Sequence, residues 1–319
     1  MTIYYIGNFD NKYSTEQYIF ECLLSQGYDV TAVQEDMLTS KQHLELSEGY
    51  DLLLFAKGRV KDGVEGLEFL LNNFKGKKAF WLFDKMYDFR PERAEWMDRI
   101  IPLVDIYFIT DGSAKEHYNK FKTPYKILRQ GGMKPYYGRV KREFQQYQVA
   151  FLGALYTDER KKMLEAVDKR YKLIIGGTKD MYQFRGQQLA DLCASVPVVL
   201  ADVLTYRDGD KIKTYKDYWS NRIYELLSCG ALLVHPYIQD KDFWNEFGKD
   251  GNFLFDEYFI GYEIGNLDHM FKKIDEALTM PELARKEMQN KGRELVCGKL
   301  SYNNRVRSMM RHIYSTYAL

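Results

Sequence analysis

The chain has 319 residues, of which 45% are hydrophobic, and its 46 basic and 45 acidic side chains leave a formal charge of +1. At roughly 100–200 residues per domain, this length predicts about two domains. The balanced charge argues against nucleic acid as the main partner, because a dedicated binder usually carries a clear excess of Lys and Arg. The apolar runs are far shorter than the roughly 20 residues of a membrane-spanning helix, so no membrane span is expected.

In the first part of the chain, short apolar segments alternate with helical ones. Strands are expected at 2–9, 28–33, 51–58, 77–84 and 105–110, and the segment 124–132 closes this half. Helices are expected at 14–27, 63–76, 90–104 and 112–121. The first helix has Ser14 as a candidate N-cap and Gly27 as a stop. A polar segment around residues 36–50 precedes the third strand.

The alternation stops at residues 134–147, which are polar and basic and are interpreted as a linker, and then it restarts. Strands are expected at 148–155, 172–177, 196–203 and 231–236, with a further short one at 252–257. Helices are expected at 157–171, 181–195, 220–229, 266–296 (with a break near Pro281) and 301–319.

This order of elements predicts an α/β protein with two Rossmann-like domains, because alternating strands and helices form a parallel sheet covered on both faces. The expected parts are an N-terminal domain at 1–133, the linker at 134–147, a C-terminal domain at 148–300 and a last helix at 301–319. Ligands bind outside the carboxyl ends of the strands in such sheets, so we expect the site in a cleft between the two halves.

The four cysteines and five histidines are scattered, without the spacing of a metal site or a redox motif. We interpret the cysteines as reduced thiols, and the N-terminus looks like a strand rather than a signal peptide. Both features predict a cytoplasmic protein. No metal is expected.

The segment YWSNRIYELLSCGALLVHP, residues 218–236, places an arginine and a glutamate three residues apart at the head of a short helix. The free N–H groups at Ser220 and Asn221 suit a diphosphate, and Arg222 can add a bidentate contact. Glu225 cannot serve a phosphate, but its carboxylate can accept hydrogen bonds from two ribose hydroxyls. The alternative is an exposed salt bridge on a surface helix that ends at the following glycine.

Residues 222–234, RIYELLSCGALLV, resemble the R-x-F-E-x-x-x-x-G-x-x-L signature in the C-terminal domain of GT-B glycosyltransferases. The resemblance is closest to the CgeB-like branch of the group 1 (family 4-like) enzymes. VAFLGALYTDERKKMLEAV resembles the opening of that domain, and FGKDGNFLFDE a later segment of it. RKEMQNKGRELVCGKLSYNNRVRSMM resembles the family's closing stretch, with Leu300 and Ser301 where the family has His–Thr. The resemblance covers residues 148–312; the N-terminal half matches only in pattern, with WLFDKMYD like the family's strand–Asp loop.

The resemblance implies a hexosyl- or pentosyltransferase that needs no catalytic metal and no cofactor, with a UDP-sugar as the expected co-substrate. The C-terminal domain would bind this donor, the N-terminal domain the acceptor, and the last helix would pack back on the N-terminal domain. The donor nucleotide and phosphates are assigned to Gly153, Arg160, Ser220, Asn221, Arg222 and Glu225, with Glu225 as the ribose ligand. Asp217 stands where the wider family has a glutamate that contacts the donor sugar.

The residues that follow strands of the N-terminal half are the candidates for the acceptor side: Gly7, Asn8, Lys85 and Tyr87. Asp84 ends a strand and would serve as general base for an acceptor hydroxyl if the enzyme inverts the sugar; a helix cap or turn is the alternative. The acceptor class stays open between a small molecule, a glycan, a protein and modified DNA.

Two other sequence patterns can each be interpreted in two ways. Asp208-Gly209-Asp210 could be the metal-binding Asp-x-Asp of the other large glycosyltransferase fold, but Asp-Gly favours a tight turn. The basic segment 126–142 could bind a polyanion such as DNA, and a solvated linker is preferred. A phage-type DNA glycosyltransferase acting on a hydroxymethylated base and a non-enzymatic two-domain binding protein therefore remain as alternative functions.

Overall fold

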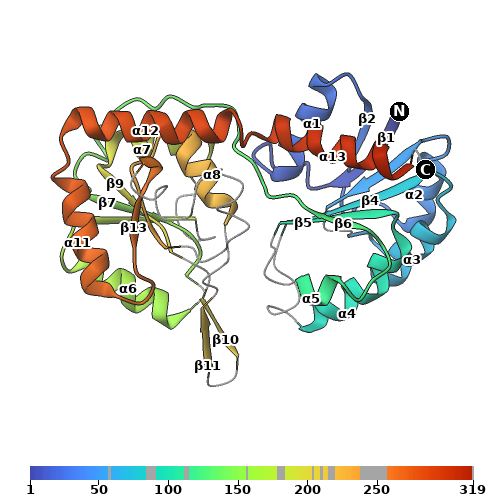
Figure 1. Cartoon of the computed structure of the whole chain (residues 1–319), viewed down its shortest axis with the longest axis horizontal. Helices are drawn as coiled ribbons and strands as arrows, with labels where there is room; N and C mark the ends of the chain where they lie inside the picture. The colour runs from blue at the N-terminus through green and yellow to red at the C-terminus, as the bar shows by residue number, and fades with distance from the viewer. Residues whose placement is uncertain are drawn as a thin grey trace. The chain divides into compact units, whose positions relative to one another are not determined.

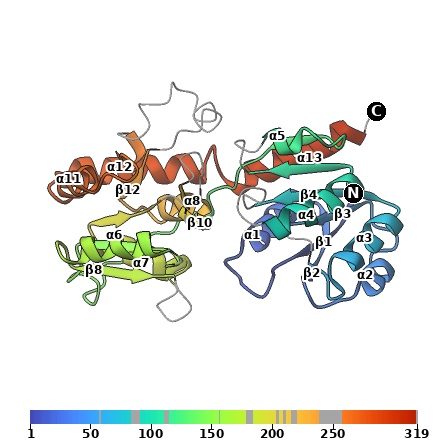
Figure 2. The ribbon, with the colours of Figure 1, turned by 90° about the horizontal axis from the view of Figure 1, so that it is seen from below.

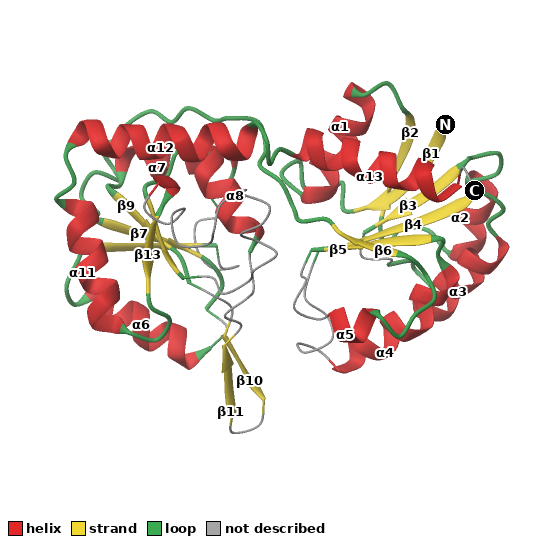
Figure 3. Ribbon diagram, in the orientation of Figure 1, coloured by secondary structure: helices red, strands yellow, loops and turns green. Residues whose placement is uncertain are grey.

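A computed structural model describes the protein, and it covers residues 1–56, 59–83, 91–110, 115–155, 157–177, 184–202, 205–208, 211–214, 220–237 and 257–317. The chain divides into two compact units. Unit 1 consists of Met1–Gly131 and Tyr302–Leu319, and unit 2 of Gly132–Ser301. Each has a parallel sheet between helices, as the ribbon coloured by secondary structure shows (Figure 3).

The sheet of unit 1 has six strands in the order β2-β1-β3-β4-β5-β6, all parallel. Their bounds are β1 (Thr2–Gly7), β2 (Asp29–Gln34), β3 (Leu52–Phe55), β4 (Lys77–Leu82), β5 (Ile106–Ile109) and β6 (Tyr125–Ile127). The central strands β3 and β5 are buried at every residue. Such continuous apolar runs are typical of a parallel sheet with both faces covered.

Helices cover both faces of this sheet (Figure 1). They are α1 (Thr15–Ser25), α2 (Ser40–Leu46), α3 (Gly63–Asn73), α4 (Pro91–Ile100), α5 (Lys115–Tyr118) and α13 (Tyr302–Tyr317). On one face, α3 and α4 contribute Leu67, Leu70 and Met97 to a core with Phe55 and Phe80. On the other, α13 packs against α1 and β5, although about 275 positions separate α1 from α13 in the chain.

Named contacts hold α13 in unit 1. The rings of Tyr18 and Tyr302 stack with their centroids 6.2 Å apart, and Arg305 Nε donates to the carbonyl of Gln130 at 3.2 Å. The last helix of the sequence is therefore part of the first folding unit.

The sheet of unit 2 has five parallel strands in the order β13-β12-β9-β7-β8. Their bounds are β7 (Val149–Leu152), β8 (Leu173–Gly176), β9 (Val198–Leu200), β12 (Leu233–Pro236) and β13 (Ile260–Tyr262). A separate antiparallel pair is formed by β10 (Thr205–Asp208) and β11 (Lys211–Thr214).

Two cores lie on the two faces of this sheet. The helices of unit 2 are α6 (Asp158–Asp168), α7 (Gly186–Ser195), α8 (Asn221–Ser228), α11 (Leu267–Leu278) and α12 (Glu282–Cys297). One core joins α7, α8 and the end of α12, and the other joins α6 and α11. Figure 2, turned by 90°, shows α11 and α12 next to each other, and the two helices are also consecutive in the sequence.

Several details differ from the sequence-based expectation. The polar segment 36–50 contains α2, which Thr39 and Gln42 begin with a reciprocal capping box. The helix expected at 181–195 begins at Gly186 among the described residues, because Arg185 is extended (φ −143°, ψ 150°) and Gly186 has φ 54°. The strand expected at 252–257 lies almost wholly outside the described residues. No helix in the described part of the chain is both long and apolar enough to cross a membrane.

Candidate functional site

The first turn of α8 is built as the sequence predicts. Ser220 is extended (φ −80°, ψ 142°) and its hydroxyl accepts a hydrogen bond from Arg222 N at 3.2 Å, which makes it the N-cap. Asn221 opens the helix, and one turn places Arg222 and Glu225 on the same side. α8 is buried from Ile223 onward because it packs between the sheet and α12.

The carboxylate of Glu225 contacts two arginines. Arg222 Nη1 donates to Oε2 at 2.7 Å, and Arg185 Nη1 lies 3.0 Å from both Oε1 and Oε2. The side chain of Glu225 is 6% exposed, against 21% for Arg222 and 30% for Arg185. We call these three residues the arginine–carboxylate group. It carries two positive charges and one negative charge, so one positive charge is left over.

Burial lowers the pKa of Arg222 from its usual value, while the neighbouring Glu225 carboxylate opposes that shift. A guanidinium nevertheless stays protonated at neutral pH. Both arginines therefore remain cations, and their exposed fractions leave them reachable from solvent.

This geometry corrects the alternative interpretation of the motif. The i,i+3 bridge between Arg222 and Glu225 is formed, but Glu225 is buried rather than exposed. It also has a second cation that sequence spacing did not reveal. Arg185 is the N-cap residue of α7, and 40 positions separate it from Glu225. No local pattern predicts such a contact.

Gly153 follows β7 and lies at the carboxyl end of the sheet. Its N–H donates to the Gly176 carbonyl at the end of β8, at 2.9 Å. The next residue, Gly177, has φ 99°, and a Cβ there would lie 3.2 Å from Gly153 N. Glycine at position 177 therefore allows the two chain segments to approach closely where the strands end. The expected role of Gly153 in nucleotide binding stays a prediction.

Arg160 lies in the first turn of α6, behind the N-cap Thr157. Its Nε donates to Asp202 at 3.1 Å and its Nη1 to the Ala154 carbonyl at 2.7 Å, and the residue is 8% exposed. Ala154 follows β7 and Asp202 follows β9, so Arg160 joins the ends of two neighbouring strands. Its phosphate-binding role also stays a prediction.

In unit 1, the loop after β1 is held by hydrogen bonds. The Gly7 carbonyl accepts from Glu35 N at 2.8 Å, and the Asn8 carbonyl accepts from Ser14 Oγ at 2.5 Å. A Cβ at Gly7 would lie 2.9 Å from Glu16, so α1 could not pack as closely. The acceptor-side candidates Lys85 and Tyr87, the candidate base Asp84 and the candidate sugar ligand Asp217 lie outside the described residues.

Of the Asp-x-Asp segment, the structure describes Asp208 alone, and it pairs with Lys211 in the antiparallel β10–β11 ladder. Gly209 and Asp210 lie outside the described residues, so the turn stays a prediction. Within the described part of the chain, no three His, Cys, Asp or Glu side chains gather as a metal site would require.

Two parallel sheets, each covered by helices and each in its own unit, are the architecture of the GT-B fold. Residues 158–311 match a family model described as "Glycosyl transferase-like". Over these residues, just under half of the chain, the protein is similar to glycosyltransferases, and its fold is of the GT-B type.

Solved structures agree on the fold. HepE (Alr3699) of Anabaena, in complex with UDP and glucose, has a TM-score of 0.63 at 7% identity, over 99% of this chain and 100% of that one. An α-glucosyltransferase in complex with UDP-glucose and DNA containing an abasic site has a TM-score of 0.66 at 10% identity, over 98% of each chain. OtsA, in its apo structure, has a TM-score of 0.64 at 10% identity, over 98% of this chain and 99% of that one. No curated protein matches the sequence closely enough to count as a relative.

Proposed function

We propose that the enzyme uses a UDP-sugar as donor and that unit 2 binds it at the arginine–carboxylate group. The observation that carries this proposal is the pair of guanidiniums, Arg222 and Arg185, on one buried carboxylate at the starts of α8 and α7. Two cations beside helix N-termini form a site for a diphosphate. Similar folds in complex with UDP or UDP-glucose support the choice of nucleotide.

Glu225 can hold the ribose while it positions the arginines. Its Oε2 accepts from both arginines, whereas its Oε1 accepts from Arg185. A carboxylate oxygen can accept two hydrogen bonds, so Oε1 has room for a ribose hydroxyl. One residue would then recognise the ribose and keep both guanidiniums directed toward the diphosphate.

The arginines would also serve the chemical step. When the bond between the sugar and the diphosphate breaks, negative charge develops on the leaving diphosphate. Fixed cations at that position stabilise the charge without a metal. We therefore propose transfer to an acceptor hydroxyl by a metal-independent mechanism, with Gly153, Ser220 and Asn221 as further donor-side residues and Asp217 near the sugar. Asp84, Gly7, Asn8, Lys85 and Tyr87 are proposed for the acceptor side.

A DNA acceptor is the second candidate, because a similar fold occurs in complex with DNA. The charge of unit 1 does not favour it. Unit 1 contains 20 basic and 20 acidic residues, whereas a surface that follows DNA needs a basic excess. We therefore favour an acceptor other than DNA.

Calorimetric titration with UDP, GDP, ADP and TDP, with and without EDTA, tests the donor site. We expect UDP to bind most tightly and EDTA to leave its affinity unchanged. Binding that requires Mn²⁺ or Mg²⁺ and is lost in Asp208→Ala would overturn the metal-independent proposal. A salt-sensitive complex with duplex DNA would favour the DNA acceptor.

A further inference from the structure

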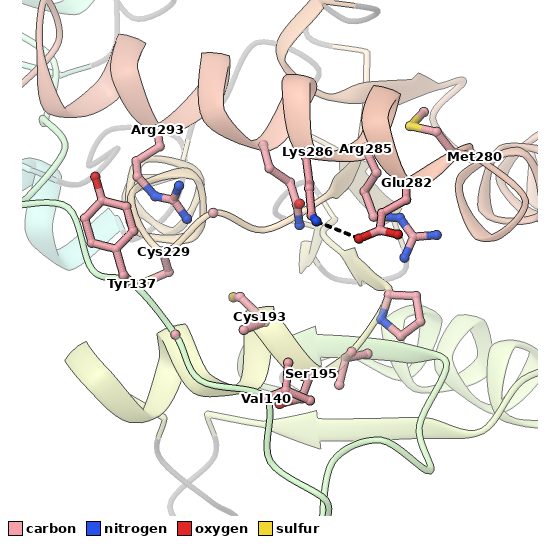
Figure 4. Close-up of a pocket in the computed structure, with 16 residues that line it drawn as sticks. Tyr137, Val140, Cys193, Ser195, Cys229, Met280, Glu282, Arg285, Lys286 and Arg293 are labelled. Carbon is pink, nitrogen blue, oxygen red and sulfur yellow. Dashed lines mark ion pairs between the residues drawn. The ribbon is translucent and has the colours of Figure 1, made fainter.

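A cavity of about 590 Å³ lies in unit 2, beside α7, α8 and α12 (Figure 4). Its wall comes from residues 137–140, the end of α7, the residues after α8 and the first turns of α12. Arg185, Arg222 and Glu225 do not line it, although Cys229, which does, follows Glu225 by four residues, a rise of about 6 Å. The lining is thus different from that of the proposed donor site, and the volume is that of a small-molecule site.

Three cations line the cavity, against one acid. The cations are Arg285, Lys286 and Arg293, and the acid is Glu282. Lys286 Nζ lies 2.6 Å from Glu282 Oε1, so these two neutralise each other. The two guanidiniums remain as the charge of the cavity.

Neither guanidinium has a carboxylate within ion-pair distance among the residues that the structure describes. Arg285 Nη2 donates to the Leu278 carbonyl at 3.5 Å, and Arg293 Nη1 donates to Asn290 at 3.1 Å. The Nε atoms of both arginines are buried without a hydrogen-bond partner in the described part of the chain. Because these Nε atoms are closed to solvent, an anion in the cavity would contact the Nη groups, and among the described residues the contacts above use one of the four Nη N–H bonds of each arginine.

The start of α12 adds to the attraction for an anion at one end of the cavity. This helix of 16 residues begins after Pro281, with no side-chain cap, so its first N–H groups and its partial positive charge lie beside Arg285. At the other end, Gly230 follows the C-terminus of α8 and lies against Arg293, so the partial negative charge of that terminus offsets part of the charge of Arg293. The Arg285 end is therefore the stronger anion subsite.

The spacing of the two arginines suggests the shape of the ligand. Arg285 and Arg293 are eight residues apart on one face of α12, a rise of about 12 Å. Val140, Val196 and Pro197 contribute an apolar wall. Arg293 lies over the ring of Tyr137, 4.7 Å from its centroid, which holds the guanidinium at its end of the cavity.

We propose that this cavity binds an elongated organic bis-anion, with a phosphate or carboxylate group at each end and a partly apolar middle. The anion at one end would contact Arg285 and the start of α12, and the anion at the other end would contact Arg293. The same helix, α8, leads from this cavity to Arg222 and Glu225, so an occupant would also stabilise the helix that carries the donor residues. The proposal does not depend on which nucleotide binds at the donor end.

Hexamethylene bisphosphonate is the probe, with hexyl phosphonate and hexanol as its one-anion and neutral counterparts. In calorimetric titration of the wild-type protein, we expect the bisphosphonate to bind about ten- to a hundredfold more tightly than hexyl phosphonate, because it adds one charge-assisted contact. Hexanol should bind weakest. Equal affinities for the bisphosphonate and hexyl phosphonate would overturn the bis-anion proposal.

Variants of the lining locate the binding. Arg285→Gln should lower bisphosphonate affinity by about tenfold or more, and Arg293→Gln by less. Lys291→Gln is the matched control, because Lys291 lies on α12, pairs with Glu287 at 2.8 Å and does not line the cavity. Affinity that survives in Arg285→Gln would overturn the proposal, as would a loss in Arg222→Ala, which would place the probe in the donor site.

Val140→Trp gives a test that removes no charge. Val140 is 60% exposed, so a larger side chain is compatible with folding there while it fills the cavity. Bisphosphonate binding should be lost with an unchanged melting temperature. Unchanged binding in this variant would exclude the cavity as the site, even if an arginine variant fails to fold.

Discussion

Two groups in unit 2 bring arginine and carboxylate together, and they differ in what the guanidinium does. Arg160 contacts Asp202 and the Ala154 carbonyl, so one cation joins two chain segments at the ends of neighbouring strands. Arg222 and Arg185 instead converge on the single carboxylate of Glu225. The first arrangement joins parts of the fold, whereas the second leaves a positive charge in excess. A surplus of cations over carboxylates is therefore the feature that separates an anion site from a structural bridge.

The largest expected effect is on stability, at Arg160. Arg160→Met leaves the buried Asp202 without this partner, and breaking a buried pair costs about 3–5 kcal/mol. Urea denaturation should show a loss of this size, while titration with UDP shows less than about a tenfold change in affinity, equivalent to 1.4 kcal/mol. Arg170→Met is the control, because its pair with Asp275 is about half exposed and contributes about 0–1 kcal/mol. A large loss of UDP affinity with little loss of stability would make Arg160 a phosphate ligand.

The second effect concerns the carboxylate that holds the two arginines. Glu225→Gln leaves two neighbouring guanidiniums without a counter-charge, so we expect a stability loss of about 1–3 kcal/mol. That exceeds the 0.2–0.5 kcal/mol of an exposed i,i+3 pair. Denaturation of the wild-type protein and the variant checks the difference.

Ligand titrations of the same variant separate the two roles of Glu225. Pyrophosphate should bind more tightly to Glu225→Gln, because the excess positive charge grows. UDP should lose its advantage over 2′-deoxy-UDP, since the amide is a weaker acceptor for the second hydroxyl. A variant that keeps the wild-type preference for ribose would show that Glu225 only positions the arginines.

The third effect is on donor binding. Arg222→Ala and Arg185→Ala should each weaken UDP binding by about 1.5–3 kcal/mol, the range for a charge-assisted contact. Lys141→Ala is the control, since Lys141 pairs with Asp191 at 3.6 Å away from α8. Titration of the three variants with UDP gives the comparison, and equal small effects would make both arginines ordinary surface residues.

The smallest effect per residue is a pH dependence of stability, which sets the pH for these measurements. Burial lowers the pKa of His43 in unit 1 and of His235 in unit 2 to about 4, below the usual value of 6.5. Between pH 6.5 and 4, the unfolded chain therefore binds more protons, and stability is lost as the pH falls through this window. Each histidine should cost about 1–2 kcal/mol at pH 5. Denaturation at pH 7.5 and pH 5 tests this, and His43→Phe should reduce the difference; equal stability at both pH values would contradict it.

Periodic patterns in the sequence were enough to predict most elements. Alternating apolar strands and helices predict both parallel sheets, and the break near Pro281 falls between α11 and α12. Where the pattern is weak, the prediction fails. α2 has no clear apolar stripe in a polar segment, although its capping residues Thr39 and Gln42 are a readable signal. The β10–β11 hairpin and the short strand β13 also went unpredicted.

The sequence by itself determined the start of α8. Ser220, Arg222 and Glu225 are close along the chain, and the helical repeat alone brings them to one side of the first turn. Only the tertiary structure decided that Arg185 joins them, that Glu225 is buried, and that Arg285 and Arg293 face a cavity. The physical reason is that local periodicity determines which residues share a face of one helix. Contacts between helices depend instead on how the faces of the sheet are covered, and that is set by the whole unit.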